Sequence, residues 1–206
     1  MLKAMAAAAH LRRSSPLAQG ARVLLVLLTL MWVSEIADTL ANHRLDQYGI
    51  EPRDPEGLAG IVTSPFLHAG FGHLIGNTIP LLIMGLGIAL AGAARVISVT
   101  IVVGLVAGLG TWLTAPAGSE TIGASGIVFG YATYLIVRFF FTRRVFDLAL
   151  GLVVLAVWGA SLLASLAPTP GVSWQAHLFG ATGGVVAARY AAPAGRRARR
   201  PRAASG

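Results

Sequence analysis

Six long apolar stretches follow one another along the chain, and each is long enough to cross a membrane. They run over residues 22–41, 73–92, 96–115, 125–141, 145–166 and 176–192. A transmembrane helix needs about 20 predominantly apolar residues to span the hydrocarbon core of a bilayer. The pattern therefore predicts an all-α membrane protein, with six transmembrane helices between residues 22 and 192.

The composition of the 206-residue chain supports this prediction, because 55% of the residues are hydrophobic and only 12% are charged. The charged share is about half that of an ordinary soluble domain. A soluble fold of this length would have too few charged side chains to cover its surface. The chain contains no cysteine, which excludes a disulfide framework, a thiol nucleophile and a thiolate metal site.

Positive charge is distributed unevenly along the chain, which carries 16 Lys and Arg against 8 Asp and Glu. If six helices alternate in direction, fourteen of these basic residues lie on one side of the membrane, and only Arg44 and Arg53 lie on the other. The positive-inside rule then predicts that both termini are cytoplasmic, in what we expect to be a bacterial plasma membrane. The basic excess is explained by topology, so we expect no nucleic-acid partner.

The two ends of the chain lie outside the predicted membrane domain of residues 22–192. Residues 1–21 are predicted to form a basic cytoplasmic segment, and residues 193–206 a basic cytoplasmic tail that is disordered. The tail could bind anionic lipid, although a topology signal is the simpler interpretation. A cleaved signal peptide is a less favoured interpretation of the first apolar stretch, because that stretch is long and residues 35–38 make a poor cleavage site.

The connection over residues 42–72 is much longer than the others and is predicted to be extracytoplasmic. Besides acidic residues and turn formers it contains apolar residues, namely Ile50, Leu58, Ile61, Val62, Phe66 and Leu67. A solvated linker would not need these side chains. We therefore expect this loop to be folded and to rest partly in the outer membrane interface.

Few polar side chains occur within the apolar stretches, and each is a candidate functional residue because its burial in a membrane is costly. Ser125 precedes Arg138 by 13 residues, which places it roughly 20 Å above that arginine along a helix. His177 precedes Arg189 by 12 residues, or roughly 18 Å. A serine hydroxyl needs a base at such a matched depth to become an effective nucleophile. No acid lies at that depth, so the sequence favours a Ser–His dyad over a triad.

Two other pairs of polar residues are assigned to the membrane interfaces. Glu35 and Asp38 lie one turn apart near the outer end of the first stretch, and we interpret them as interfacial rather than catalytic. Arg138 and Asp147 lie near cytoplasmic ends, where they are expected to pair or to reach the headgroups.

The residues around Ser125 fit a nucleophile at a loop-to-helix junction. Gly123 and Gly126 permit tight backbone geometry and a close approach of substrate. The helix that begins at Ser125 would present unpaired N–H groups and the positive end of its dipole to an oxyanion. For this tetrapeptide alone, an N-cap serine with packing glycines is an equally good interpretation.

His73 and Asn77 are spaced i, i+4 and therefore share one helix face near the outer end of the second stretch. Both side chains can donate hydrogen bonds, as an oxyanion hole requires. A polar contact between helices without any chemistry is the alternative. A zinc site at His68 and His73 is disfavoured, because the spacing is not that of a zinc protease motif and no carboxylate lies beside them.

Two pairs of glycines suggest how the distant parts of this site meet. Gly126 and Gly130 lie in the fourth stretch, and Gly180 and Gly184 lie in the sixth. Small residues at this spacing let two helices pack at close range. If the two faces meet, Ser125 and His177 are brought together just above the contact.

Taken together, these residues resemble the rhomboid intramembrane serine proteases. The motifs that carry the resemblance are His68-x4-His73-x3-Asn77, Gly123-Ala124-Ser125-Gly126 and Ala176-His177-x2-Gly180-x3-Gly184, and they occur in the family's order. The resemblance implies a six-helix rhomboid-like bundle in which Ser125 is the nucleophile and His177 the general base. It also implies that His73, Asn77 and the amide of Ser125 form the oxyanion hole.

The resemblance extends to residues that would support the site, namely His68, Gly123, Gly126, Phe129, Gly180 and Gly184. Phe129 occupies the place where family members often carry a tyrosine that packs on the catalytic histidine. Phenylalanine keeps the ring and loses the hydroxyl. The first loop also lacks the Trp-Arg pair of many members and has residues 49–53 instead, so its anchoring differs from theirs.

The implied activity is that of a serine endopeptidase, a hydrolase that cleaves transmembrane protein substrates near the extracytoplasmic membrane face. No cofactor and no metal are implied, and the expected partners are these substrates and the lipid bilayer. A catalytically inactive rhomboid-like protein that binds membrane clients is the first alternative. A small transporter is a weaker one, because the cytoplasmic halves of the stretches offer few polar groups for a solute path.

Overall fold

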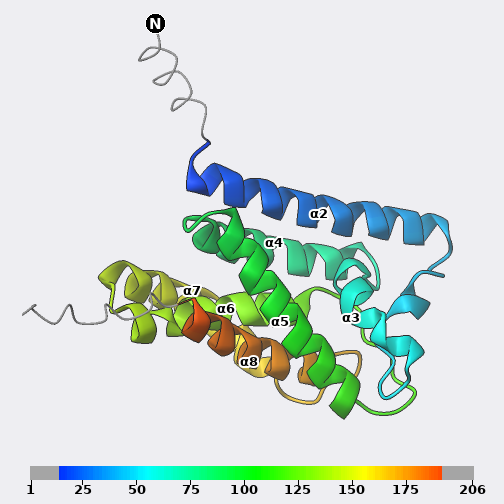
Figure 1. Ribbon diagram of the computed structural model, residues 1–206. Helices are drawn as coiled ribbons and strands as arrows, with labels where there is room; N and C mark the ends of the chain where they lie inside the picture. The colour runs from blue at the N-terminus through cyan, green and yellow to red at the C-terminus, as the bar shows by residue number, and fades with distance from the viewer. Residues whose placement is uncertain (1–13, 192–206) are drawn as a thin grey trace, which may run out of the picture.

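A computed structural model describes residues 14–191 of the chain, which form helices and connecting loops without any named strand. The long helices are α2 (Pro16–Leu40), α4 (Phe71–Ala89), α5 (Ala93–Thr114), α6 (Ser125–Thr142), α7 (Val145–Ala164) and α8 (Trp174–Tyr190) (Figure 1). Five helices, α2 and α4 to α7, are long and apolar enough to cross a membrane. The helix α8 has 17 residues. The six-span count and the orientation of the termini therefore stay predictions.

Helix α2 begins earlier than the apolar pattern indicates. It starts at Pro16, within the segment 1–21 that was predicted to precede the membrane domain. The Ser15 side chain accepts a hydrogen bond from the amide of Ala18, and proline is well suited to the first helical position, so the cap rather than the apolar run sets this boundary. The rest of the basic N-terminal segment and the tail, including its predicted lipid contact, lie outside the described residues.

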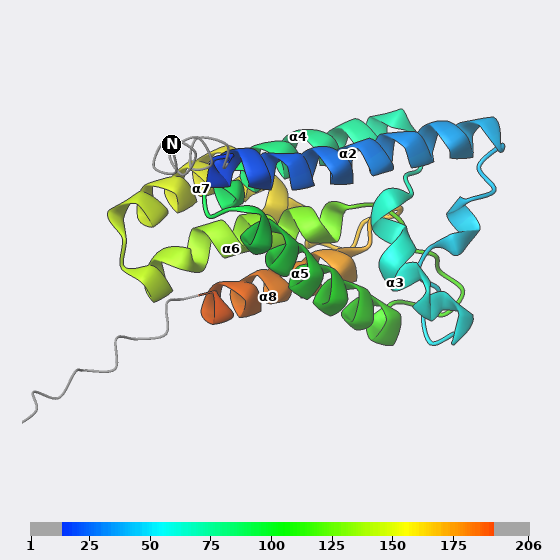
Figure 2. The ribbon, with the colours of Figure 1, turned by 45° about the horizontal axis from the view of Figure 1, so that its top comes forward.

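Helix α6 is the central element of the bundle. It packs against α8, α7, α4 and α5, and α8 also lies against α5. On the other side of the bundle α2 covers α4 and α5, and Figures 1 and 2 show α2 running alongside α4. The central position of α6 places its first residue, Ser125, within reach of α4 and α8.

At two pairs of glycines, α6 and α8 approach each other so closely that their backbones touch. A Cβ atom added at Gly180 would lie 2.1 Å from the carbonyl oxygen of Gly126, and one added at Gly184 would lie 2.3 Å from that of Gly130. Glycine at these positions is therefore what allows the close approach. The two glycine faces therefore meet, which is the condition under which the sequence brings Ser125 and His177 together.

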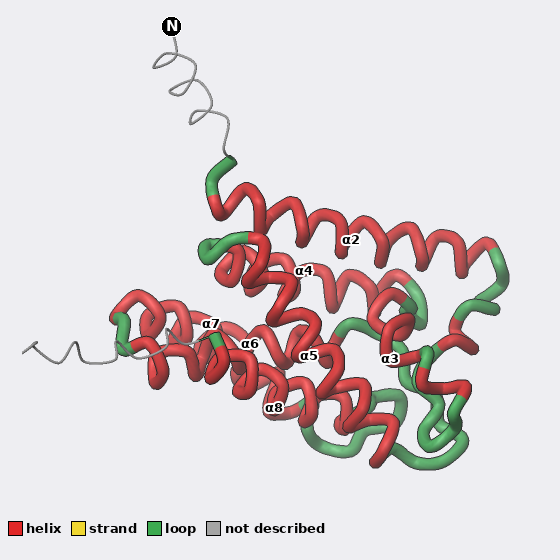
Figure 3. Tube along the Cα trace, in the orientation of Figure 1, coloured by secondary structure: helices red, strands yellow, loops and turns green. Residues whose placement is uncertain are grey.

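The long connection between α2 and α4 is folded, as the sequence predicts. It contains four short helical turns, η1 (Asp46–Tyr48), η2 (Glu56–Leu58), α3 (Gly60–Thr63) and η3 (Ser64–Phe66). Backbone hydrogen bonds in both directions join Ile50 to Thr121, and the Arg53 guanidinium donates to the carbonyls of Leu113 and Ala115. Figure 3 shows that this loop and the loops before α6 and α8 lie at the same end of the bundle.

Candidate active site

Ser125 and His177 are in direct contact at this end of the bundle. Ser125 is the first residue of α6, and His177 lies in the first turn of α8. The Nε2 atom of His177 lies 2.9 Å from the Oγ atom of Ser125, although the two residues are 52 positions apart in sequence. This distance is within the range over which an imidazole can take a proton from a hydroxyl.

A backbone carbonyl fixes the orientation of the His177 ring. The Nδ1 atom of His177 lies 2.8 Å from the carbonyl oxygen of Ser165, which follows α7. A carbonyl can only accept a hydrogen bond, so Nδ1 carries the proton, and in a neutral imidazole Nε2 is then the acceptor that faces Ser125. The sequence offers no acid to orient His177, and this partner could not be predicted from it, because a backbone carbonyl leaves no signature in a sequence.

Phe129 holds the other surface of the His177 ring. The two ring centroids are 4.1 Å apart and the ring planes differ by 4°, which is a stacked arrangement. Phe129 is buried and lies one turn after Ser125 on α6, so the same helix positions both the hydroxyl and the ring that packs on the base. The expected stacking is confirmed.

His73 and Asn77 approach the backbone just before Ser125. A Cβ atom added at Gly123 would lie 2.6 Å from Cε1 of His73 and 3.5 Å from Nδ2 of Asn77. Gly123 also has a φ of +110°, and its amide donates to the carbonyl of Ser64 at 2.8 Å. Only glycine satisfies both the space and the backbone conformation here, so Gly123 lets the two α4 side chains lie against the loop that leads into Ser125.

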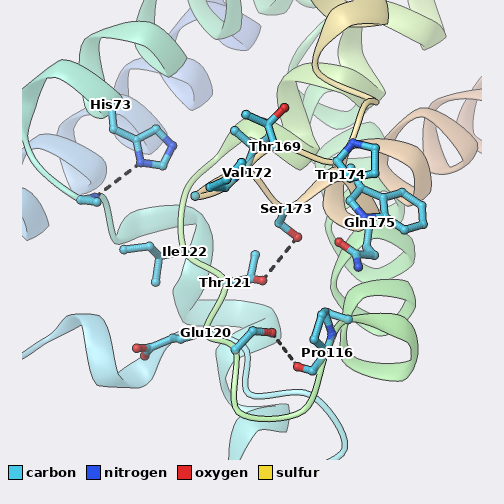
Figure 4. A pocket seen from close by; sticks show the side chains of 16 residues that line it. His73, Pro116, Glu120, Thr121, Ile122, Thr169, Val172, Ser173, Trp174 and Gln175 are labelled. Carbon is cyan, nitrogen blue, oxygen red and sulfur yellow. Dashed lines mark hydrogen bonds between the residues drawn. The ribbon is translucent and has the colours of Figure 1, made fainter.

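Two hydrogen-bond donors are available at this point. The Nδ1 atom of His73 accepts a hydrogen bond from the amide of Ala69 at 3.4 Å (Figure 4). In the neutral ring the hydrogen is therefore carried by Nε2. This atom would lie 2.7 Å from a Cβ atom added at Gly123. Asn77 is buried, and its Nδ2 atom has no hydrogen-bond partner among the described residues. An unpaired buried donor costs about 1–3 kcal/mol, which a bound acceptor would recover.

His68 packs behind His73. Its ring is fully buried and meets the His73 ring edge-on, with centroids 5.1 Å apart. Burial, and after it the nearby charge of His73, lowers the pKa of His68 to about 4. The ring is therefore neutral at pH 7 and supports His73 by packing.

A cavity of about 460 Å³ opens beside the Ser–His pair at the loop end of the bundle. Its wall is formed by the loops before α6 and α8 together with His73, and a hydrogen bond between Thr121 and Ser173 joins the two loops (Figure 4). Ser125 and His177 do not belong to this wall, and His177 is 6% exposed. The Ser–His pair therefore lies outside the cavity wall.

The five long apolar helices indicate an integral membrane protein, and a comparison with known protein families gives its class. The Rhomboid domain family matches residues 55–194, which is more than half of the chain. The protein belongs to the rhomboid family.

Similar proteins occur in several bacteria. The chain is 43% identical over 188 residues to the uncharacterized protein Rv1337 of Mycobacterium tuberculosis, covering 87% of this chain and 78% of that protein. The identity to the uncharacterized protein ML1171 of Mycobacterium leprae is 43% over 177 residues, covering 82% and 70%. The Bacillus subtilis protein YdcA, provisionally named a rhomboid protease, is 29% identical over 126 residues, covering 60% of this chain and 62% of its own.

Proposed function

We propose that the protein is an intramembrane serine endopeptidase that hydrolyses peptide bonds of transmembrane substrates near the extracytoplasmic membrane face. The observation that carries the proposal is the 2.9 Å contact between Nε2 of His177 and Oγ of Ser125, in a chain of the rhomboid family. A hydroxyl beside an unprotonated imidazole nitrogen is the arrangement that nucleophilic catalysis by serine requires.

In the proposed mechanism, Oγ of Ser125 attacks the carbonyl carbon of the scissile bond while Nε2 of His177 takes the hydroxyl proton. His177 then returns this proton to the leaving amine, and an acyl-enzyme remains on Ser125. A water molecule attacks the ester with the help of the same imidazole and frees the serine. The Ser165 carbonyl holds the Nδ1 proton throughout. Because that carbonyl is uncharged, it stabilises the imidazolium less than a carboxylate would.

The negative oxygen that forms in this mechanism would be held by three donors. They are the backbone amide of Ser125 at the start of α6, the Nε2 hydrogen of His73 and the side-chain amide of Asn77. The approach of both α4 side chains to Gly123 supports this assignment. The N-terminal N–H groups of α6 have no partner within the helix, and the helix dipole favours negative charge there.

The proposal includes a topology and a preference for substrate. Helix α8 would be the sixth span, both termini would be cytoplasmic, and the loops around the cavity would face the extracytoplasmic side of a bacterial plasma membrane. A substrate helix has to unwind before its backbone can reach Ser125, so segments rich in glycine and alanine are expected to be cleaved best.

Covalent labelling of Ser125 by a fluorophosphonate tests this function directly. We expect the detergent-purified protein to be labelled at Ser125, and the Ser125→Ala variant to remain unlabelled. Ser165→Ala is the matched control, because it removes the hydroxyl of a serine whose carbonyl contacts His177 and keeps that carbonyl in place. A folded protein that is not labelled at Ser125 would instead be the inactive, client-binding alternative.

Replacing Asn77 with alanine is expected to lower kcat by about 10²–10³-fold, the usual cost of removing one oxyanion donor. KM should change little, because the donor acts mainly in the transition state. The measurement is steady-state cleavage of a helical reporter substrate in detergent. Thr78→Ala is the control, since the Thr78 hydroxyl contacts Trp32 of α2 instead. A raised KM at unchanged kcat would contradict the assigned role.

A further inference from the structure

A second group of chemically active side chains lies where α2 meets the first loop. Oδ2 of Asp38 lies 3.0 Å from Nδ1 of His43, and Oδ1 of Asp38 accepts from the amide of Leu45 at 2.7 Å. Asp46 completes the group: one potential ligand atom from each of Asp38, His43 and Asp46 lies within 4.8 Å of the others. We call these three residues the α2 cluster.

Buried carboxylate oxygens around the α2 cluster lack partners. Glu35 lies one turn before Asp38 on α2, and its side chain is fully buried. Neither Glu35 oxygen has a hydrogen-bond partner among the described residues, and the same is true of the buried Oδ1 atom of Asp46. The sequence places Glu35 and Asp38 near the outer membrane interface, and their side chains are 0% and 1% exposed within the fold.

The negative charge in this region exceeds the positive charge that faces it. The negative charges of Asp38 and Asp46 lie close enough to repel a charge on Glu35, and Glu120 adds a further negative charge near Asp46. Within residues 14–191, the only ion pair that any of these carboxylates makes is the one between Asp38 and His43. Buried carboxylates without a counter-charge are costly, so the arrangement calls for a cation.

We propose that the α2 cluster binds one divalent metal ion of the zinc type, with Asp38, His43 and Asp46 as ligands, in the negative field that the buried Glu35 adds. An imidazole nitrogen beside carboxylate oxygens suits zinc, whereas calcium and magnesium prefer oxygen ligands alone. Zinc bonds of about 2.0–2.2 Å place tetrahedral ligand atoms roughly 3.3–3.6 Å apart. The 3.0 Å contact and the 4.8 Å limit of the cluster bracket that separation.

The backbone of the loop agrees with a bound ion. Asn42 and His43 have φ values of 55° and 58°, a left-handed conformation that costs energy for residues other than glycine. Metal ligation would offset this cost and would tie the end of α2 to η1, which contains Asp46. The sequence predicts no metal, so the proposal departs from that expectation. The ion is structural and takes no part in the proposed peptide hydrolysis.

Zinc binding is measured on the full-length Ser125→Ala variant in detergent, so that the result does not depend on proteolysis. After treatment with a chelator, zinc chloride is titrated by calorimetry and the thermal unfolding midpoint is followed. We expect one zinc ion per chain at the cluster and, at a hundredfold excess over Kd, a rise in Tm of about 5 °C. Zinc that neither binds nor shifts Tm in the folded protein overturns the proposal.

Variants then assign the ligands. His43→Asn should fold, because the His43 side chain is 51% exposed and asparagine tolerates a positive φ. We expect it to weaken zinc binding about 100-fold. His73→Asn is the matched control, which removes another imidazole and should leave zinc binding unchanged. Equal affinity of zinc for wild type and His43→Asn, or calcium binding as tight as zinc binding, overturns the assignment.

Discussion

Cleavage of a helical reporter substrate is expected to fall by about 10⁴-fold or more when His177 is replaced by alanine. The replacement removes the acceptor that faces Ser125 at 2.9 Å, so the hydroxyl loses the base that would take its proton. At neutral pH an unassisted serine hydroxyl is a weak nucleophile. The measurement is the initial rate of cleavage in detergent, with labelling of Ser125 as a second readout.

The controls must separate lost chemistry from lost structure, because alanine at position 177 leaves a gap against Phe129. The unfolding midpoint of His177→Ala is therefore compared with that of Ser125→Ala. The double variant should cleave no more slowly than either single one, since residues that act as a unit are not additive. A His177→Ala protein that is folded and cleaves at the wild-type rate would show that the Ser–His contact is not catalytic.

The membrane helices could be predicted from the sequence because burial in lipid requires long apolar runs. The predicted stretch of residues 125–141 corresponds to α6, Ser125–Thr142, and that of 145–166 to α7, Val145–Ala164. The clearest difference is the start of α2 at Pro16, where a serine cap and a proline lengthen the helix beyond its apolar core. Local capping and hydrophobic burial obey separate rules, and the apolar pattern reports only the second.

The contacts of the site could be predicted where side chains make them. The Ser125–His177 contact followed from matched depth and from the glycine pairs, and the stacking of Phe129 followed from the family resemblance. The hydrogen bond to the Ser165 carbonyl could not be predicted, because it depends on where α7 ends in space.

The burial of Glu35 and Asp38 could not be predicted from the sequence either. Helical position placed both residues near the outer end of α2, but the first loop folds back against that helix, where Asp38 contacts His43 and Leu45. Sequence spacing reports the face and level of a side chain on its helix, whereas its exposure depends on what packs against that face. The same limit applies to the proposed metal ligands, because His43 and Asp46 belong to that loop.

Replacing Gly180 with valine is expected to damage both stability and activity, because the helices α6 and α8 touch through their backbones. Even the Cβ atom of alanine would lie 2.1 Å from the carbonyl oxygen of Gly126. Neither backbone can rotate away as a flexible side chain would, so the two helices must move apart by about 1 Å or more. Overpacking of this kind costs about 1–3 kcal/mol for alanine, and more for valine.

The activity should suffer beyond the loss of stability. Gly180 follows His177 by one turn on α8, and Gly126 directly follows Ser125 on α6, so any separation acts on the 2.9 Å contact. A misplacement of about 1 Å in a catalytic site can cost roughly 100-fold in rate. We therefore expect Gly180→Ala to lower kcat by about that factor at temperatures where the protein is still folded, and Gly180→Val to lower Tm further.

Gly104→Ala in α5 is the matched control, because no atom beyond the adjacent backbone of its own helix lies within 4 Å of the position its Cβ would take. That variant should match or slightly exceed the wild-type Tm, since alanine favours a helix more than glycine does. Cleavage rate and thermal unfolding in detergent are measured for all three variants. If Gly180→Ala keeps both the wild-type rate and the wild-type Tm, α6 and α8 do not meet at this distance in the membrane. The approach of the two glycine pairs would then no longer explain how Ser125 and His177 come together.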